Sequence, residues 1–137
     1  MTDAEVLRDY RQGMQELRIM ERQIARWESE GGPRGCAGTN WFDLPQGTNE
    51  PEAARMQQLD GLYQLWGQQR EALISLGERF ERILMGVHDQ RLRLLLRCYY
   101  GLGMTDEGIA QELHMSVRRI NTLRNAYMHM LDEHEAA

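Results

Sequence analysis

The feature that most constrains the fold is a long seam of mainly apolar residues in the middle of the chain. Its members follow one another at steps of three and four residues: Met56, Leu59, Tyr63, Trp66, Arg70, Leu73, Gly77, Phe80, Leu84 and Val87. Pro51 is well suited to be the first residue of a helix. This spacing predicts one α-helix on the order of 50 Å long, with a packing stripe along one side. We therefore expect an all-α fold.

A shorter stripe of the same kind lies near the N-terminus, between about Asp3 and Ser29. Its members are Leu7, Tyr10, Met14, Leu17 and Ile24. Two such helices joined in sequence predict a long antiparallel helical hairpin. Since the second helix is longer than the first, part of its seam must pack against the C-terminal segment or a second copy of the chain. The seam thus predicts a homo-oligomer, with a dimer favoured.

The residues between the two stripes are rich in glycine and proline. The stretch from Glu30 to Asn49 predicts a loop of roughly twenty residues, which is long for a compact domain. It contains Trp41, Phe42 and Leu44. These side chains either pin the loop onto the helices or dock a partner, and pinning is favoured because exposed aromatic residues are rarer than anchored ones.

Three shorter helices are expected after the seam. Asp89 begins the first and Gly101-Leu102-Gly103 ends it, while Thr105 and Ser116 cap the next two. The residues expected to face the core are Leu92, Leu95, Leu96, Tyr99, Ile109, Ala110, Leu113, Ile120, Leu123, Tyr127 and Met130. We expect a helical body over residues 1–87, with its loop at 30–50, and a separate module over 88–137.

Charge is unevenly distributed between these two parts. The chain carries a formal net charge of −5. From Arg91 to Asn125 there are six arginines against three acidic residues, so this stretch has +3 and the rest −8. A basic module on an acidic body is typical of nucleic-acid binding. All 16 Lys and Arg residues are arginine, which favours forked contacts with phosphate or guanine, although the base composition of the coding DNA explains the lack of lysine equally well.

The last predicted helix has an outward face suited to a DNA major groove. Arg118, Asn121, Thr122, Asn125 and His129 lie on it at 100° per residue. Arginine can bridge two acceptors of guanine, asparagine can pair with adenine, and threonine can contact several bases. A solvated polar face is the alternative, but no acidic residue occurs between Met115 and Leu131, which favours DNA.

Further residues are expected to contact phosphate around this helix. Arg119 and Arg124 are predicted on its flanks, facing the phosphate walls of the groove. The hydroxyls of Thr105 and Ser116 lie at helix N-termini, where anions bind readily. Arg91 and Arg93 are expected to point outward from the preceding helix and to contact DNA, Arg91 without preference for sequence. Adjacent arginines at a helix N-terminus, Arg118 and Arg119, are electrostatically unfavourable unless an external anion offsets them.

Other chemistries find no support in the sequence. The four histidines lack metal-site spacing, Gly35 and Gly38 do not form a phosphate loop, and no nucleophile has a recognisable base and acid. We expect no enzymatic activity and no cofactor. Cys36 and Cys98 are interpreted as reduced thiols. With no signal peptide and no membrane-spanning run, we expect a cytoplasmic protein without a membrane partner.

Residues 91–130 resemble region 4 of bacterial sigma factors, a helix-turn-helix module. The matching positions are Thr105, Glu107, Ile109, Ala110, Leu113, Ser116 and Ile120. The layout of the whole chain is similar to phage-encoded transcription regulators of the RinA/ArpU kind, with Pro33-Arg34-Gly35 as linker. Two residues depart from the pattern, namely Gly108 and the turn residue His114. The resemblance implies a double-stranded DNA-binding regulator of phage or prophage genes that acts with host RNA polymerase.

Two other functions fit the same sequence. One is a DNA-packaging subunit similar to a phage small terminase, which would use the helix-turn-helix on genomic DNA and assemble into a ring. The other is an adaptor whose sigma-like module binds RNA polymerase without contacting DNA. The size of the assembly and its partner distinguish these from a dimeric transcription regulator.

Overall fold

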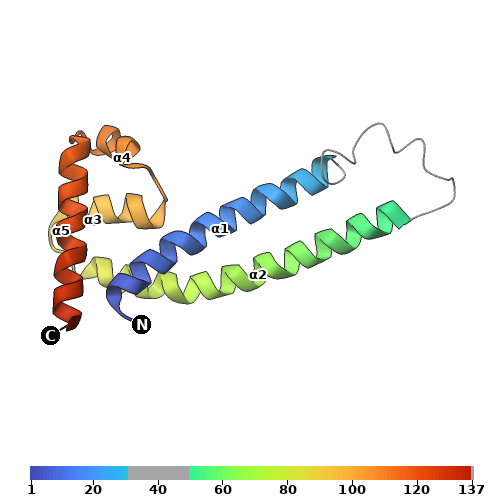
Figure 1. Cartoon of the computed structure of the whole chain (residues 1–137), viewed down its shortest axis with the longest axis horizontal. Coiled ribbons are helices and arrows are strands. Elements are labelled where there is room, and N and C mark those ends of the chain that lie inside the picture. Colours follow the sequence, from blue (N-terminus) through green and yellow to red (C-terminus); the bar gives the residue numbers. More distant parts are fainter. Residues whose placement is uncertain (31–49, 137) are drawn as a thin grey trace. The chain divides into compact units, whose positions relative to one another are not determined.

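The computed structural model describes residues 1–30 and 50–136, and within these ranges all regular structure is helical (Figure 1). In chain order the elements are α1 (Asp3–Glu30), α2 (Glu50–Met85), α3 (Gln90–Leu96), the π-helical turn η1 (Arg97–Gly101), α4 (Asp106–Leu113) and α5 (Val117–Ala136). The all-α class is confirmed. The expected loop, with Trp41, Phe42, Leu44, Cys36 and the Pro33-Arg34-Gly35 linker, falls outside the described residues. No helix within the described ranges has both the length and the apolar character needed to cross a membrane.

The chain divides into two compact units. The large unit consists of Met1–Gln15 together with the chain from Ala72 onward, and the small unit is the stretch Glu16–Glu71. This division differs from the expected boundary between residues 87 and 88. The reason is that the beginning of α1 and the end of α2 pack into the same core as the C-terminal helices.

The core of the large unit contains side chains from all of these helices. Its buried members are Ala4, Leu7, Phe80, Leu84, Val87, Leu95, Leu96, Tyr100, Ile109, Ala110, Ile120, Tyr127, Met128 and Leu131. Leu7 and Leu84 are fully buried, as are Leu95, Ile109 and Ile120 of the C-terminal helices. Because burial of apolar surface dominates folding free energy, the C-terminal helices depend on the ends of α1 and α2 for their core.

Gly77, which interrupts the apolar seam, is explained by a close contact in this unit. A Cβ at Gly77 would lie 3.4 Å from the ring of Tyr10. The Tyr10 ring stacks on Phe80 with centroids 4.8 Å apart. The absence of a side chain at Gly77 therefore gives Tyr10 room to reach Phe80.

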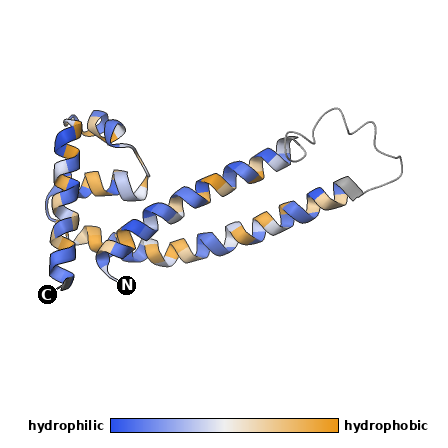
Figure 2. Cartoon of the chain, in the orientation of Figure 1, coloured by the Kyte–Doolittle hydropathy of each residue, from blue (hydrophilic) through white to orange (hydrophobic). Residues whose placement is uncertain are grey.

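Among its described residues, the small unit buries few apolar side chains. Ile24 of α1 and Leu59 of α2 are buried, as the seam predicts. Met56 and Tyr63 were expected in the packing stripe, but they are 50% and 43% exposed. Figure 2 shows hydrophobic and hydrophilic residues alternating along both long helices. The Tyr63 hydroxyl donates to a Glu28 carboxylate, so Tyr63 links the helices from the edge of the stripe.

The caps expected from the sequence organise the C-terminal helices. The Asp89 carboxylate accepts hydrogen bonds from the backbone of Arg91 and Leu92 and starts α3. After η1, Gly103 has a φ of 68°, which is the left-handed conformation that glycine favours. Thr105 caps α4 and Ser116 caps α5, as predicted.

The buried face of α5 differs from the expected one at its end. Ile120 and Tyr127 are buried as predicted, but Met130 is 52% exposed, while Met128 and Leu131 are buried. The last turns of α5 also contact the start of α1, since the backbone N–H of Asp3 donates to Glu135 at 2.7 Å. Met128 and Leu131 belong to the same buried cluster as Ala4 and Leu7 of α1, a packing partner that the sequence pattern does not show.

The turn between α4 and α5 is made by His114 in the left-handed conformation. His114 directly follows the last residue of α4 and has a φ of 55° and a ψ of 48°. Its backbone N–H donates a hydrogen bond to the Ala110 carbonyl. The structure thus accommodates histidine in a left-handed turn, a conformation that glycine favours. A side chain in this conformation costs about 1–2 kcal/mol.

Replacing His114 by glycine should raise the free energy of unfolding by about 1 kcal/mol, because glycine adopts the left-handed conformation without side-chain strain. Part of this gain is offset, since glycine also increases the conformational entropy of the unfolded chain. Urea denaturation measures the change. His129→Gly, in the middle of α5, is the matched control and should lose about 1 kcal/mol. A less stable His114→Gly protein would contradict a strained turn.

Candidate nucleic-acid interface

The first turn of α5 presents two arginines to solvent. The Ser116 hydroxyl accepts a hydrogen bond from the backbone N–H of Arg119 at 3.1 Å and fixes the start of the helix. Arg118 and Arg119 are both exposed, and no acidic residue lies in this first turn. By contrast, α1 and α4 begin with acidic residues that match the helix dipole. The positive start of α5 is thus open to an external anion.

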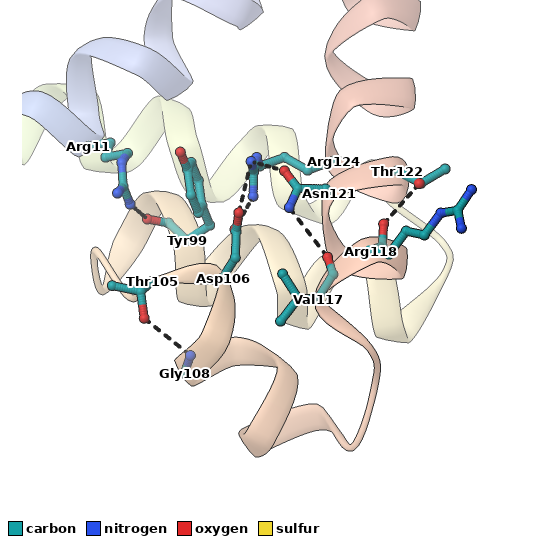
Figure 3. A network of polar contacts seen from close by, with 10 residues as sticks. All are labelled: Arg11, Tyr99, Thr105, Asp106, Gly108, Val117, Arg118, Asn121, Thr122 and Arg124. Carbon is teal, nitrogen blue, oxygen red and sulfur yellow. Dashed lines mark hydrogen bonds and ion pairs between the residues drawn. The ribbon is translucent and has the colours of Figure 1, made fainter.

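Arg124 does not lie free on the flank of α5, which corrects the prediction that it faces phosphate. Its side chain is only 11% exposed and forms an ion pair with Asp106 of α4, whose side chain is 20% exposed. Figure 3 shows the forked contact between the two groups. The charge of Arg124 is therefore used to hold the beginning of α4 against α5.

Asn121 belongs to the same network. Its Oδ1 accepts a hydrogen bond from Arg124 at 3.0 Å, and its Nδ2 donates to the Val117 carbonyl at 3.4 Å (Figure 3). Both ends of the amide are engaged within the protein, and the residue is half-buried. The expected pairing of Asn121 with adenine would require these bonds to break. We therefore assign Asn121 a positioning role beside Arg124.

Two arginines flank the ring of Tyr99. The guanidinium carbon of Arg124 lies 4.0 Å from the ring centroid and that of Arg11 lies 3.8 Å from it. Figure 3 shows them on either side of the ring. Arg11 also donates a hydrogen bond to the Tyr99 carbonyl. This stack joins α1, η1 and α5 within the large unit, and cation–π contacts of this kind are worth about 0.5–2 kcal/mol each.

The remaining outward residues of α5 are exposed. The Thr122 hydroxyl donates to the Arg118 carbonyl at 2.9 Å, which leaves its methyl group and oxygen lone pairs accessible. Asn125 is exposed, and so is His129, whose Nε2 lies 3.0 Å from Glu133. Arg118, Thr122, Asn125 and His129 thus share one outward face, as the helical periodicity predicts.

The arginines of α3 differ from one another. Arg91 is exposed as expected. Arg93 is half-buried, and its guanidinium donates to the Val87 carbonyl at 3.1 Å, so it caps the chain that leaves α2. Only the guanidinium N–H groups that do not take part in this hydrogen bond could contact phosphate, as was expected of the whole group.

Thr105 at the start of α4 is exposed, and its hydroxyl accepts a hydrogen bond from the Gly108 N–H at 3.2 Å (Figure 3).

The ten predicted contact residues thus fall into two groups. Arg91, Thr105, Ser116, Arg118, Arg119, Thr122 and Asn125 are exposed, whereas Arg93, Asn121 and Arg124 are at least partly buried and hydrogen-bonded inside the protein. Sequence reasoning also missed Arg11, which lies next to Arg124 in the fold. No local signal could have found it, because Arg11 and Tyr99 are 88 positions apart in the chain.

Tyr100, next to the stack, is buried in the core. Burial raises the pKa of its phenol from 10.0 to about 12, with the nearby Arg124 acting in the opposite direction. Because the folded pKa exceeds the unfolded one, the stability contribution of the neutral phenol is fully present below pH 10. It is lost as the pH rises from 10 through 12.

Tyr100→Phe should therefore lose less stability than the unmodified protein between pH 9 and pH 11.5, since phenylalanine cannot ionise. Urea midpoints at the two pH values measure the difference, and the subtraction removes the contribution of Tyr127, whose pKa burial also raises. Equal losses in both proteins would show that Tyr100 does not ionise from a buried position.

Comparison of the chain with protein-family models, with curated proteins and with solved structures found no significant match.

Proposed function

We propose that the chain is a sequence-specific, double-stranded DNA-binding transcription regulator. In this proposal α4, the His114 turn and α5 form a helix-turn-helix, and α5 is the recognition helix that enters the major groove. The observation that carries the proposal is the pair of exposed arginines, Arg118 and Arg119, at a helix start that has no acidic residue. A DNA phosphate or a guanine edge supplies the missing negative partner.

Arg118 is the principal base-reading residue in this proposal, with Thr122 and Asn125 further along the same face. Arg119 and Arg91 contact phosphate and position the helix without reading sequence. The ion pair between Arg124 and Asp106 supports the proposal indirectly, because it fixes α5 on α4 and so sets the direction in which Arg118 projects. Rigid support of this kind is what a sequence-reading helix requires.

Self-association belongs to the same proposal. A long antiparallel hairpin made by α1 and α2 would let two copies present two recognition helices to a repeated or palindromic site. The exposed large apolar residues of the long helices support a second copy as partner: Ile19, Met56, Tyr63, Leu65, Ile74 and Met85. Following the resemblance to sigma region 4 and to RinA/ArpU-like regulators, we place the target among phage or prophage promoters used by host RNA polymerase.

Sequencing of genomic fragments captured by the purified protein tests the proposal. We expect a few sites to be strongly enriched, and the oligomer in solution to be a dimer. If random duplex and the best captured fragment bind equally tightly at moderate salt, the sequence-specific regulator is excluded. A ring of eight or more copies with no site preference would indicate a packaging subunit instead.

A further inference from the structure

A surface pocket of the large unit is lined by residues from the first half of α1 and from α5. Its volume is about 540 Å³. The lining residues from α1 are Arg8, Arg11, Gln12 and Gln15, and Asn125 is among those from α5. The charged residues of this lining are three arginines, namely Arg8, Arg11 and Arg124. A concave surface of guanidinium and amide groups is suited to an anion with several oxygen atoms.

Two of the three arginines keep much of their charge available. Arg8 lies 3.4 Å from Asp132, but the two side chains are 55% and 54% exposed, so the pair is weak and phosphate can replace the carboxylate. Arg11 contacts the Tyr99 ring and the Tyr99 carbonyl. Neither of these groups is an anion, so the charge of Arg11 is not cancelled by them. Only Arg124 has a partly buried carboxylate partner.

The pocket continues into the outward face of α5. Asn125 lines the pocket and is also exposed. It lies two turns after Arg118, on the same side of the helix. On α1, Gln12 and Gln15 are both exposed and three residues apart, so they share one side of that helix. A phosphate strand that runs beside α5 would therefore pass directly over these groups.

We propose that the first turns of α1 form part of the DNA interface, and that this pocket receives the phosphate backbone beside the recognition helix. The inference rests on the proposed function and adds Arg8, Arg11, Gln12 and Gln15 as residues that contact phosphate. A helix in the major groove lies between two phosphate walls. The α1 segment supplies a cationic surface for one of these walls. On this side α5 cannot supply such a surface itself, because Arg124 forms an ion pair with Asp106.

Substitutions at Gln12 and Gln15 can change the charge of the pocket without removing a buried side chain, because both residues are exposed. Gln15→Arg adds a cation to the pocket, and the double change of Gln12 and Gln15 to Glu adds two anions. In the double variant the new carboxylates lie four residues after Arg8 and Arg11, which is a favourable spacing, while the one at position 12 also lies four residues before Glu16, which offsets part of that gain. Gln23→Glu makes the same change at an exposed position of α1 in the small unit and is the matched control.

The affinity of each variant is measured by fluorescence anisotropy, on the best captured fragment and on random duplex, between 50 and 200 mM salt. We expect Gln15→Arg to steepen the dependence of log affinity on log salt by about 1, as one added phosphate contact does. The double Glu variant should bind both duplexes several-fold more weakly and by similar factors, because phosphate contacts carry no sequence information. Gln23→Glu should leave both affinities unchanged.

The two proposals fail in distinguishable ways. If the variants at Gln12 and Gln15 behave like Gln23→Glu while Arg118→Ala still weakens binding, the α1 inference is overturned and the proposed function remains. If the unmodified protein binds no duplex at any salt concentration, both are overturned. Circular dichroism of each variant establishes that the helical content is retained.

Discussion

Asp106→Ala is expected to lower the free energy of unfolding by about 2–3 kcal/mol. The change leaves Arg124 with no carboxylate in a site where its side chain is only 11% exposed. Breaking a fully buried ion pair by removing one partner costs about 3–5 kcal/mol, and the residual exposure of this pair reduces the expected cost. Chemical denaturation monitored by circular dichroism measures the loss.

The neighbouring Glu107 provides the control for this variant. Glu107 lies in the same first turn of α4 and is exposed, so Glu107→Ala removes the same favourable charge from the helix start but breaks no buried pair. Its expected cost is below about 1 kcal/mol. In the double variant Asp106→Ala, Arg124→Met, the loss should be smaller than the sum of the single losses. Equal effects of Asp106→Ala and Glu107→Ala would show that the ion pair contributes no stability.

Arg118→Ala is expected to weaken binding to the best captured DNA fragment by about 1–3 kcal/mol, the value of one good contact between arginine and guanine. The affinity for random duplex should fall much less, so the ratio of specific to non-specific binding shrinks. The stability of the protein should not fall, because Arg118 is exposed, its side chain is not part of the core, and its charge at the helix N-terminus is unfavourable without an anion. Titrations with both duplexes at one salt concentration measure the ratio.

Arg91→Ala is the matched control, since it also removes one exposed guanidinium from the basic module. Loss of a phosphate contact weakens binding to all DNA sequences by about the same factor. We therefore expect Arg91→Ala to reduce specific and random binding by similar factors. If Arg118→Ala and Arg91→Ala have the same profile, α5 contacts the backbone only, and the assignment of Arg118 to base reading is excluded.

The two sets of variants separate the stabilising arginine of α5 from the interface arginines. Variants of the Asp106–Arg124 pair should change stability first and DNA affinity only as a consequence of a loosened α5. Variants of Arg118 should lower DNA affinity without a loss of stability. Measuring both quantities for both sites therefore tests the division of the predicted contact residues into buried and exposed groups.

The helices could be predicted from the sequence because their signals are local. Stripes at steps of three and four residues gave α1 and α2, and the caps at Asp89, Thr105 and Ser116 gave the starts of the three helices that follow. A cap depends only on a side chain and the backbone two or three residues ahead. The sequence also places His114 in the turn between two helical patterns, and the structure gives this residue a left-handed conformation.

The candidate interface could be predicted only in part. The outward face of α5 contains Arg118, Thr122 and Asn125 in the structure, as helical periodicity requires. Periodicity does not reveal whether a residue on the flank of a helix meets solvent or another helix. Arg124 lies on such a flank, and its contacts with Asp106 of α4 and Tyr99 of η1 turn it inward. Asn121, which was expected on the outward face, is half-buried and bonded to Arg124.

By itself the sequence determined the all-α class, the positions of the helices and the basic character of the segment around α5. Only the tertiary structure decided which arginines are left for a partner and that the start of α1 shares a core with α3, α4 and α5. The physical reason is the range of the interactions. Helical periodicity and capping act within a few residues, whereas the partners of Arg11 and Arg124 lie 88 and 18 positions away and meet them only after the helices have packed.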